Sequence, residues 1–597
     1  MRRLAAAVLA ALALAPAALA APNPTYAVYD SKGHLVQTEF APPDTTPKLS
    51  KKRASDIALK YPKVASWLKH YPSVISYDAS YEPKTLAWTV HVYSGKAGEV
   101  ARVKVDDPSA TVSQAFTGAQ VAWGMARGGP GAFGGEKINN HWIWLAFCAV
   151  FFLGLADLRR LSSLRNLDLF ALLFFTASLW YFNRGDIFTS VPLAYPPLVY
   201  LLGRSIWIGI HGRGTGTRPF WPVWVLVAAT VFLAGFRVGL NVEASNVIDV
   251  GYAGPIGAER IVTEHQAPYG HFPVEDTLKP CGPADAEGEI RERIQTNGRC
   301  ESANAQADTY GPVSYEAYIP GYLLFGWSGR WDSLPAAHAT TILFDLLCIV
   351  GLALVGLRFG GPRLGATLAF AWTAYPFTQY VSSSNTNDSI LPAFLIFGFL
   401  FVSSAFKRGI FAALSGWTKF ASLIIAPLWL TYPSWPEAVR RRSAAFFVGG
   451  FALATVLAFS ILFLEPNFFH AVKVFYLRTI KSQIDRESPF SLWDWRQYHA
   501  KGIPDLHRVQ QALEVLLVIG ALVVSLLPRR KSPLQLAAFT AALLIGFELV
   551  LTHWFYLYIP WFFPFVAIAL LAPAAVPVRV EETEPSGHPV RELVPAG

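Results

Sequence analysis

The chain has 597 residues, of which 53% are hydrophobic and only 15% charged, and its mean hydropathy is +0.34. This composition excludes an ordinary soluble protein and predicts many membrane spans. The formal net charge of +9 would suit a nucleic-acid partner. The Arg and Lys residues cluster instead in short loops between apolar runs, which is the positive-inside pattern. We therefore expect membrane lipids as partners and no nucleic acid.

Residues 1–21 have a basic start, an apolar stretch and an Ala-x-Ala end. This pattern predicts a secretory signal peptide, cleaved near Ala20 or Ala21. An uncleaved anchor is the alternative. Either interpretation places the residues that follow outside the cytoplasm.

Residues 22–127 are predicted to form a small extracytoplasmic α+β domain. An amphipathic helix is expected at Ser55–His70, followed by strands at Leu86–Tyr93, Ala101–Val105 and Thr111–Ala115. This order, with the hairpin VKVDDPSATVSQAFTG, resembles PepSY-like modules. The glycine-rich residues 128–141 are predicted to be a flexible linker into the membrane.

Eleven apolar runs of near-span length follow. They cover residues 142–158, 168–183, 187–210, 221–241, 336–357, 364–381, 389–406, 443–464, 509–527, 534–552 and 555–572. With the first run starting outside, the basic clusters fall on the cytoplasmic side. The loops 242–335 and 465–508 are then external, and the polar tail 573–597 is expected to be cytoplasmic and disordered.

One further apolar segment, 409–430, has basic residues on both sides. A full crossing would invert the charge pattern downstream, so a re-entrant hairpin is predicted instead. Gly416 and Lys419 mark its expected break, since irregular backbone is tolerated at membrane depth where it lines a cavity.

The chain contains four cysteines. Cys148 and Cys348 lie in apolar runs and are expected to be small buried hydrophobes. Cys281 and Cys300 share the loop 242–335, and a disulfide between them is predicted if that loop is external; two free thiols are the alternative.

Asp249 follows the run 221–241 directly, and a carboxylate beside a membrane exit is a functional candidate. It could instead cap the helix suggested by Ala253–Thr263. Other polar and aromatic residues are expected at the same membrane face. They are Tyr252, Tyr269, Tyr310, Tyr315, Asn387, Arg486, Ser488, Trp493, His553 and Tyr556. Asp388 begins an apolar run and is interpreted as a helix cap.

Three motifs carry a resemblance to a known family. An Asp-Tyr pattern at Asp249 and Tyr252 precedes the sequence QAPY that ends at Tyr269, SGWTKF contains Lys419, and RESPFSLW begins at Arg486. Residues 221–572 resemble the catalytic core of GT-C membrane glycosyltransferases, closest to the polyprenol-phosphate-mannose-dependent α-mannosyltransferases of family GT87 (DUF2029). The additional spans in 142–220 depart from that pattern.

The resemblance implies a mainly α, polytopic membrane enzyme of the bacterial plasma membrane with an external active site. It would transfer a sugar from a polyprenyl-phosphate donor to a glycolipid or glycan acceptor, with inversion. Asp249 would be the general base, and Glu264 and Asp308 are alternatives. Arg486 and Lys419 would bind the departing phosphate, and His553 would orient a substrate. The other substrate-binding residues implied are Tyr252, Tyr269, Tyr310, Tyr315, Asn387, Ser488 and Trp493. No cofactor and no metal ligands are indicated.

Each role has a structural alternative. Arg486 could pair with Asp485 or Glu487, Lys419 could snorkel to the interface, and His553 could be a structural residue. For the whole chain, a transporter or flippase of lipid-linked substrates is the main alternative. It would need ionisable side chains deep in several spans, which look nearly free of them. A non-catalytic membrane sensor or scaffold is a third possibility.

Overall fold

The structure is a computed structural model that describes residues 28–29, 31–32, 35–37, 45–72, 75–129, 133–214, 220–271, 279–282, 292–294, 300–302, 307–327 and 334–572. The predicted signal peptide at 1–21, the tail at 573–597 and part of the linker at 128–141 lie outside these residues. Helices make up most of what is described. The expectation of a mainly helical protein is confirmed.

The chain divides into two compact units. The first comprises residues 1–65, 77–92 and 102–115, and the second comprises residues 66–76, 93–101 and 116–597. A four-stranded sheet has the order β3 (Ser76–Glu82), β4 (Ala87–Tyr93), β5 (Glu99–Asp106) and β6 (Thr111–Thr117). Three of these strands were predicted. The first was not predicted, although Tyr77, Ala79 and Tyr81 alternate with polar residues in its sequence, SYDASYE.

The helix predicted at Ser55–His70 forms as two shorter helices, α2 (Lys51–Lys60) and α3 (Pro62–Leu68). Tyr61 between them is extended, with φ −61° and ψ 129°. The following proline ring disfavours a helical conformation at the residue before it, which explains the break.

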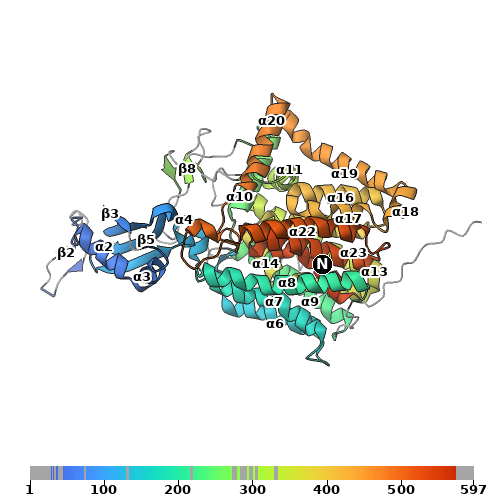
Figure 1. The fold of residues 1–597 in the computed structure, drawn as a ribbon, viewed down its shortest axis with the longest axis horizontal. Coiled ribbons are helices and arrows are strands. Elements are labelled where there is room, and N and C mark those ends of the chain that lie inside the picture. The colour runs from blue at the N-terminus through green and yellow to red at the C-terminus, as the bar shows by residue number, and fades with distance from the viewer. Residues whose placement is uncertain are drawn as a thin grey trace, which may run out of the picture. The chain divides into compact units, whose positions relative to one another are not determined.

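Six described helices are long and apolar enough to cross a membrane. They are α8 (Ile187–His211), α9 (Val223–Ala244), α13 (Pro335–Ala374), α19 (Ser443–Phe459) extended by η5 (Ser460–Leu464), α22 (His507–Leu526) and α23 (Pro533–Val550). In Figure 1, α7 (Leu164–Phe182), α8, α23 and α22 run side by side. The chain is thus compatible with a multi-pass membrane protein, although only six helices meet these criteria against the eleven spans predicted.

Other apolar helices are shorter than the predicted spans. They are α6 (His141–Leu155), η3 (Asn387–Ser389) with α15 (Ile390–Leu400), and η8 (Tyr556–Tyr558) with α24 (Ile559–Leu571). The run predicted at 364–381 is interrupted, because α13 ends at Ala374 and α14 (Pro376–Ser384) begins after the extended Tyr375.

A sharp turn inside α13 separates its two apolar halves. Gly361 has a φ of 76°, a conformation that glycine adopts without steric cost, and Pro362 follows it. A Cβ on Gly356 would collide with the backbone nitrogen of Gly365, so the two halves pack closely where they reverse. The runs predicted at 336–357 and 364–381 are therefore distinct helical segments.

The predicted hairpin is present as α16 (Ala405–Thr418), η4 (Phe420–Ile425) and α17 (Ala426–Leu430). Its break is at Lys419, which is extended with φ −142° and ψ 127°. Arg408 near the start of the first limb donates from Nε to the carbonyl of Trp429, 2.8 Å away, and from Nη2 to the carbonyl of Tyr432, 3.2 Å away. The far ends of the two limbs therefore lie together, and Lys419 occupies the tip.

The spans are not nearly free of ionisable residues, so that expectation was wrong. Arg237 of α9 pairs with Asp345 of α13, with 2.5 Å between Nη2 and Oδ1, and both are buried. Asp168 of α7 pairs with Arg204 of α8 at 2.8 Å. Glu548 of α23 is also buried. The two ion pairs join neighbouring helices, a contact that a hydropathy profile does not reveal.

The remaining described elements are short. They are β1 (Val28–Tyr29), β2 (Leu35–Gln37), η1 (Gly95–Ala97), α4 (Ala119–Ala122), η2 (Gly124–Arg127), α5 (Gly135–Asn139), α10 (Asp249–Val262), β7 (Pro280–Cys281), β8 (Glu292–Ile294), β9 (Cys300–Ser302), α11 (Pro312–Glu316), α12 (Ile319–Phe325), α18 (Trp435–Arg440), α20 (Phe468–Phe475), η6 (Tyr476–Lys481), α21 (Ser482–Ile484) and η7 (Trp495–Tyr498).

Candidate functional site

A buried ion pair joins η3 to the tip of the hairpin. The Nζ of Lys419 lies 2.5 Å from Oδ1 of Asp388, and the two side chains are 8% and 1% exposed. Trp561 donates from Nε1 to the same oxygen at 2.9 Å, and Thr386 donates to Oδ2 at 2.7 Å. Hydrogen bonds thus satisfy both oxygens of the carboxylate, as a buried charge requires.

Three aromatic rings surround the ammonium of Lys419. The centroids of Tyr310, Tyr558 and Trp561 lie 5.1, 5.4 and 5.1 Å from Nζ. At these distances the ring faces attract a cation, and more strongly where water is excluded. The rings hold Lys419 in one place, in a cluster that we call the Lys419 cage (Tyr310, Asp388, Tyr558 and Trp561).

Asp249 is the first residue of α10 and is exposed. Its Oδ1 accepts the backbone N–H of Val250 at 2.9 Å. Asp249 lies in the first turn of the helix, but the N-cap position is Ile248, and the helix has no side-chain cap hydrogen bond among the described residues. Asp249 also acts electrostatically on Lys419 and Tyr310. The helix begins four residues earlier than the sequence suggested, and its first residue is within electrostatic range of the Lys419 cage.

The start of α10 is docked on the loop that carries Asp388. The backbone N–H groups of Asn246 and Ile248 donate to the carbonyls of Ser383 and Ser384 at 3.0 and 3.2 Å. A Cβ on Gly251 would collide with the carbonyl oxygen of Asn385. Only glycine allows the two segments to approach this closely, and the approach brings both carboxylates into one region.

Arg486 lies close to the same cluster. Its guanidinium is over the Trp123 ring at 5.9 Å, and its charge acts on Lys419 and His553. Its buried Nε has no hydrogen-bond partner among the described residues. Asp485, one of the two partners considered in the structural alternative, pairs with Lys481 at 2.5 Å. Arg486 thus keeps a donor that an anion could use.

His553 and Ser488 come together as neighbours of Arg486. The Oγ of Ser488 lies 2.9 Å from Nδ1 of the imidazole. Burial, together with the charges of Arg486 and Lys419, lowers the pKa of His553 well below 6.5. Burial and the charge of Asp249 also raise the pKa of Tyr310 above its usual 10.0. Both side chains are therefore neutral near pH 7 and can exchange hydrogen bonds with a ligand.

Other predicted site residues are placed in supporting positions. Tyr252 is buried beside Trp327, with ring centroids 5.8 Å apart. Tyr269 donates to the carbonyl of Tyr310 at 3.1 Å, and Tyr315 donates to that of Ala307 at 2.7 Å. The phenols of Tyr269 and Tyr315 are thus hydrogen-bonded to backbone carbonyls, and they hold the loop that carries Tyr310.

Two more predicted residues, Trp493 and Asn387, do not contact the Lys419 ammonium in the described contacts. Trp493 donates from its indole to the carbonyl of Leu549 at 2.9 Å. Asn387 donates to Ser314 Oγ at 3.4 Å, while its buried Oδ1 has no partner within the described residues. Asn387 is the one of the two that retains a polar atom for a ligand.

The alternative bases are both occupied by cations. Asp308 is fully buried and pairs with Arg478 at 2.6 Å, and Glu264 pairs with Arg260 at 2.5 Å. Asp249 is more accessible to a substrate hydroxyl than Asp308.

Sequence reasoning missed the roles of Asp388, Tyr558, Trp561 and Trp123. Asp388 was interpreted as a cap, although a carboxylate and a lysine that both lie in apolar segments have strong reason to pair. That signal was available in the sequence. The aromatic residues gave none, because they are common throughout the spans.

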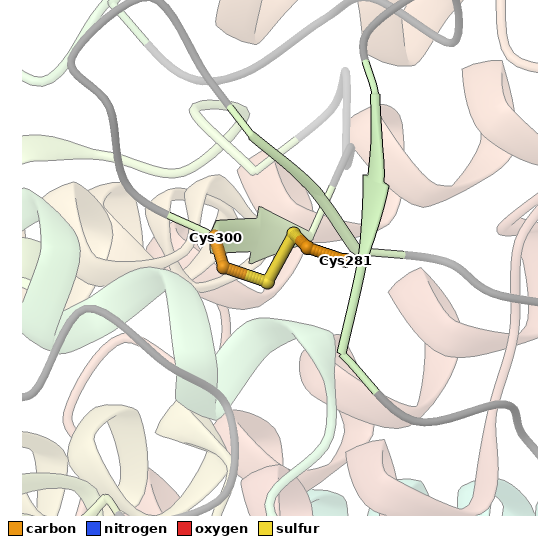
Figure 2. The surroundings of a disulfide bond; sticks show 2 residues. All are labelled: Cys281 and Cys300. Carbon is orange, nitrogen blue, oxygen red and sulfur yellow. A yellow bond between two sulfur atoms is a disulfide. The ribbon is translucent and has the colours of Figure 1, made fainter.

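The loop between α10 and α11 contains a disulfide between β7 and β9. Figure 2 shows Cys281 and Cys300 joined through their sulfur atoms, with 5.9 Å between their Cα atoms. Strand β8 pairs with both strands. The bond closes a loop over a separation of 19 residues.

Within the described residues, no group of three or more His, Cys, Asp and Glu side chains could hold a metal ion. A cavity of about 130 Å³ lies between the loop after α10 and helix α20, and no residue of the Lys419 cage lines it. It is lined by Tyr269, His271, Glu465 and His470, among others. His271 and Glu465 are 3.0 Å apart there.

A scan against protein-family models, a search of the curated proteins and a search of the solved structures each found no match.

Proposed function

We propose that this protein is a membrane glycosyltransferase of the GT-C type. It transfers a sugar, mannose or another hexose or pentose, from a polyprenyl-phosphate donor to a glycolipid or glycan acceptor. The observation that carries the proposal is that the charges of an exposed carboxylate, Asp249, and of a second cation, Arg486, both act on Lys419, the buried cation at the hairpin tip.

In this proposal Asp249 is the general base. The acceptor oxygen forms a bond to the anomeric carbon, the bond from that carbon to the phosphate oxygen breaks, and the hydroxyl proton passes to the Asp249 carboxylate. A single displacement of this kind inverts the anomeric configuration and needs no covalent nucleophile. Asp388 is less suited to the role, because it is 1% exposed and already accepts hydrogen bonds from three side chains.

The departing polyprenyl phosphate requires stabilisation of its growing negative charge. Arg486 offers a guanidinium that can bind phosphate oxygens in a bidentate manner, and Lys419 offers a fixed point charge. Asp388 acts as a positioning residue, since it holds the Lys419 ammonium. The neutral imidazole of His553 can orient a sugar hydroxyl.

We further propose that the site faces the extracytoplasmic side of a bacterial plasma membrane. The Cys281–Cys300 disulfide lies in the loop that precedes Tyr310, and disulfides persist in oxidising compartments. In the same proposal the sheet of β3 to β6 belongs to an extracytoplasmic domain.

Sugar transfer from a radiolabelled polyprenyl-phosphate-mannose donor in membranes tests the proposal. Replacing Asp249 by Asn should lower transfer by about 100-fold or more, because the base is lost while the shape is kept. The matched control is Asp505→Asn, which changes an exposed carboxylate in the loop before α22 and should leave transfer intact. Equal activity of both variants would exclude Asp249 as the base.

A transporter or flippase is the second candidate, favoured by the buried ionisable residues Arg237, Asp345 and Glu548 in the apolar helices. Purified protein in liposomes that carry a fluorescent polyprenyl phosphate distinguishes the two functions. If the protein translocates the lipid but transfers no sugar from any of the polyprenyl-phosphate sugars tested, the enzyme proposal is wrong and the transporter replaces it.

A further inference from the structure

A basic helical segment after α19 presents an unusually apolar surface. The segment 468–484 consists of α20, the π-helical turn η6 and α21 in direct succession. Ala471, Phe475 and Thr479, spaced four residues apart, are buried. This stripe faces the protein, so the other side of the segment faces outward.

Large apolar side chains cover the outward side. Phe469 is 83% exposed and Ile484 is 75% exposed. The other exposed apolar residues are Val472, Tyr476, Leu477 and Ile480. An apolar face of this size is unfavourable in water and marks an interaction surface.

The charge of the segment is positive. Lys473, Arg478 and Lys481 are its basic residues, and it contains no Asp or Glu. Arg478 is engaged with the buried Asp308. Lys473 and Lys481 are exposed beside the apolar residues, and Lys481 pairs there with the exposed Asp485. Lys473 is four residues from both Phe469 and Leu477, so it lies within the apolar face, where its long stem can run along that face while its ammonium reaches a polar layer. An apolar helix face that also carries lysines is typical of helices that lie in the interface of a bilayer with anionic lipids.

The apolar surface continues from a membrane-spanning helix. Phe463, at the end of the span Ser443–Leu464, is 69% exposed and stacks on Phe468 with 4.4 Å between ring centroids. Phe469 packs edge-on against Phe468 at 5.7 Å. In Figure 1, α20 runs across the direction of α22 and α23. The segment 468–484 therefore runs in a different direction from the membrane-spanning helices, while the exposed apolar surface of the span continues onto it.

The protein-facing side contacts the loop that carries Tyr310. Arg478 holds Asp308, whose Oδ2 also accepts the N–H of Gly270 at 2.7 Å. Phe475 packs edge-on against Tyr269 at 5.0 Å, and Tyr269 donates to the carbonyl of Tyr310. The segment and the Lys419 cage are therefore connected through two short sets of contacts.

We propose that the segment 468–484 lies flat in the headgroup layer of the bilayer. Its apolar side chains enter the acyl boundary, and Lys473 and Lys481 bind anionic phospholipid headgroups. The contacts through Asp308 and Tyr269 then fix the Lys419 cage at the depth of the lipid phosphates. This inference does not depend on sugar transfer.

Depth-dependent quenching of the full-length protein in nanodiscs tests the location. A fluorescent thiol label is placed on Phe469→Cys and, as a matched control, on Asp505→Cys in a polar exposed loop. The parent protein, with half-buried Cys148 and buried Cys348, supplies the background. We expect spin-labelled lipids to quench the label at position 469 at least about threefold more than at position 505, and aqueous iodide to show the reverse. Equal quenching at both positions by both agents would overturn the proposal.

The lipid preference is tested with a second variant. Anionic phosphatidylglycerol in a phosphatidylcholine nanodisc should increase lipid quenching at position 469 in the otherwise native protein. The change should disappear when Lys473 and Lys481 are both replaced by Gln, which keeps the apolar face. Lipid quenching that does not respond to phosphatidylglycerol would overturn the proposed headgroup contact.

Discussion

Lys419 and Asp388 depend on each other because both are buried. Removing one partner leaves an uncompensated charge in an apolar environment, whereas removing both leaves two neutral groups. We expect Lys419→Met alone to lower the free energy of unfolding by about 3–5 kcal/mol. The double variant Lys419→Met/Asp388→Asn should recover much of this loss.

Chemical denaturation of the purified proteins in micelles measures this coupling as a double-mutant cycle. Transfer activity should be absent from both variants, since each lacks the ammonium. Additive losses of stability would show that the pair is not coupled, contrary to the 2.5 Å contact.

His553 predicts a dependence of stability on pH. The pKa of its buried imidazole is well below the ordinary 6.5, so below pH 6.5 the unfolded chain binds a proton that the folded protein does not. Stability is then complete above pH 6.5 and falls as the pH is lowered from 6.5 towards the folded pKa, by up to about 1.4 kcal/mol per pH unit.

Thermal unfolding at pH 7.5 and 5.5 measures this effect. The unfolding temperature of the native protein should fall more between the two pH values than that of His553→Gln, which has no group to protonate at this position. The other histidines contribute equally to both proteins. An identical fall in both would exclude a depressed pKa at His553.

At the level of elements, the docking of α10 on the loop 383–387 decides where Asp249 lies. A Cβ on Gly251 would meet the Asn385 carbonyl, and a backbone atom cannot move aside as a flexible side chain can. Gly251→Ala should therefore cost about 1–3 kcal/mol and displace α10. Transfer activity should fall with it.

The control for this substitution is Gly239→Ala in α9, where a Cβ would meet no atom within 4 Å. It places alanine in a helix, so stability should be unchanged or slightly higher. Unfolding temperatures and transfer rates of both variants provide the comparison. Equal behaviour of the two would mean that α10 does not pack against this loop.

The sequence predicted the hairpin break at Lys419 because charge on both flanks constrains where a chain can turn. The distribution of basic residues also predicted that Asp249, Arg486, Ser488 and His553 lie on one side of the membrane. The sequence did not predict that Asp388 binds Lys419, because Asp388 was interpreted as a helix cap and its apolar surroundings were not weighed. Nor did it reveal the buried pair of Arg237 and Asp345, because a hydropathy average conceals two charges among apolar neighbours.

At the scale of the whole molecule, the disulfide reports on which side of the membrane the loops lie. If the loop 242–335 is external, as proposed, Cys281 and Cys300 should resist a maleimide-polyethylene-glycol reagent on intact cells until a reductant is added. Replacing both by Ser should lower stability by about 3 kcal/mol or less.

A shift in gel mobility after reduction measures the labelling. The variant with both cysteines replaced is the control, because Cys148 and Cys348 then account for any remaining shift. Labelling without reductant would contradict the bond, and labelling only after the cells are broken would place the loop in the cytoplasm.

The composition of the Lys419 cage has a consequence for how the protein is made. Asp388 is synthesised before Lys419, so the ion pair can form as soon as the hairpin emerges. Tyr558 and Trp561 belong to η8 and α24, the last described helices, and they arrive only when those helices are inserted. A nascent chain that stops before them leaves the lysine with an incomplete enclosure in the membrane. The same contacts that enclose the Lys419 ammonium therefore distinguish a finished chain from an unfinished one.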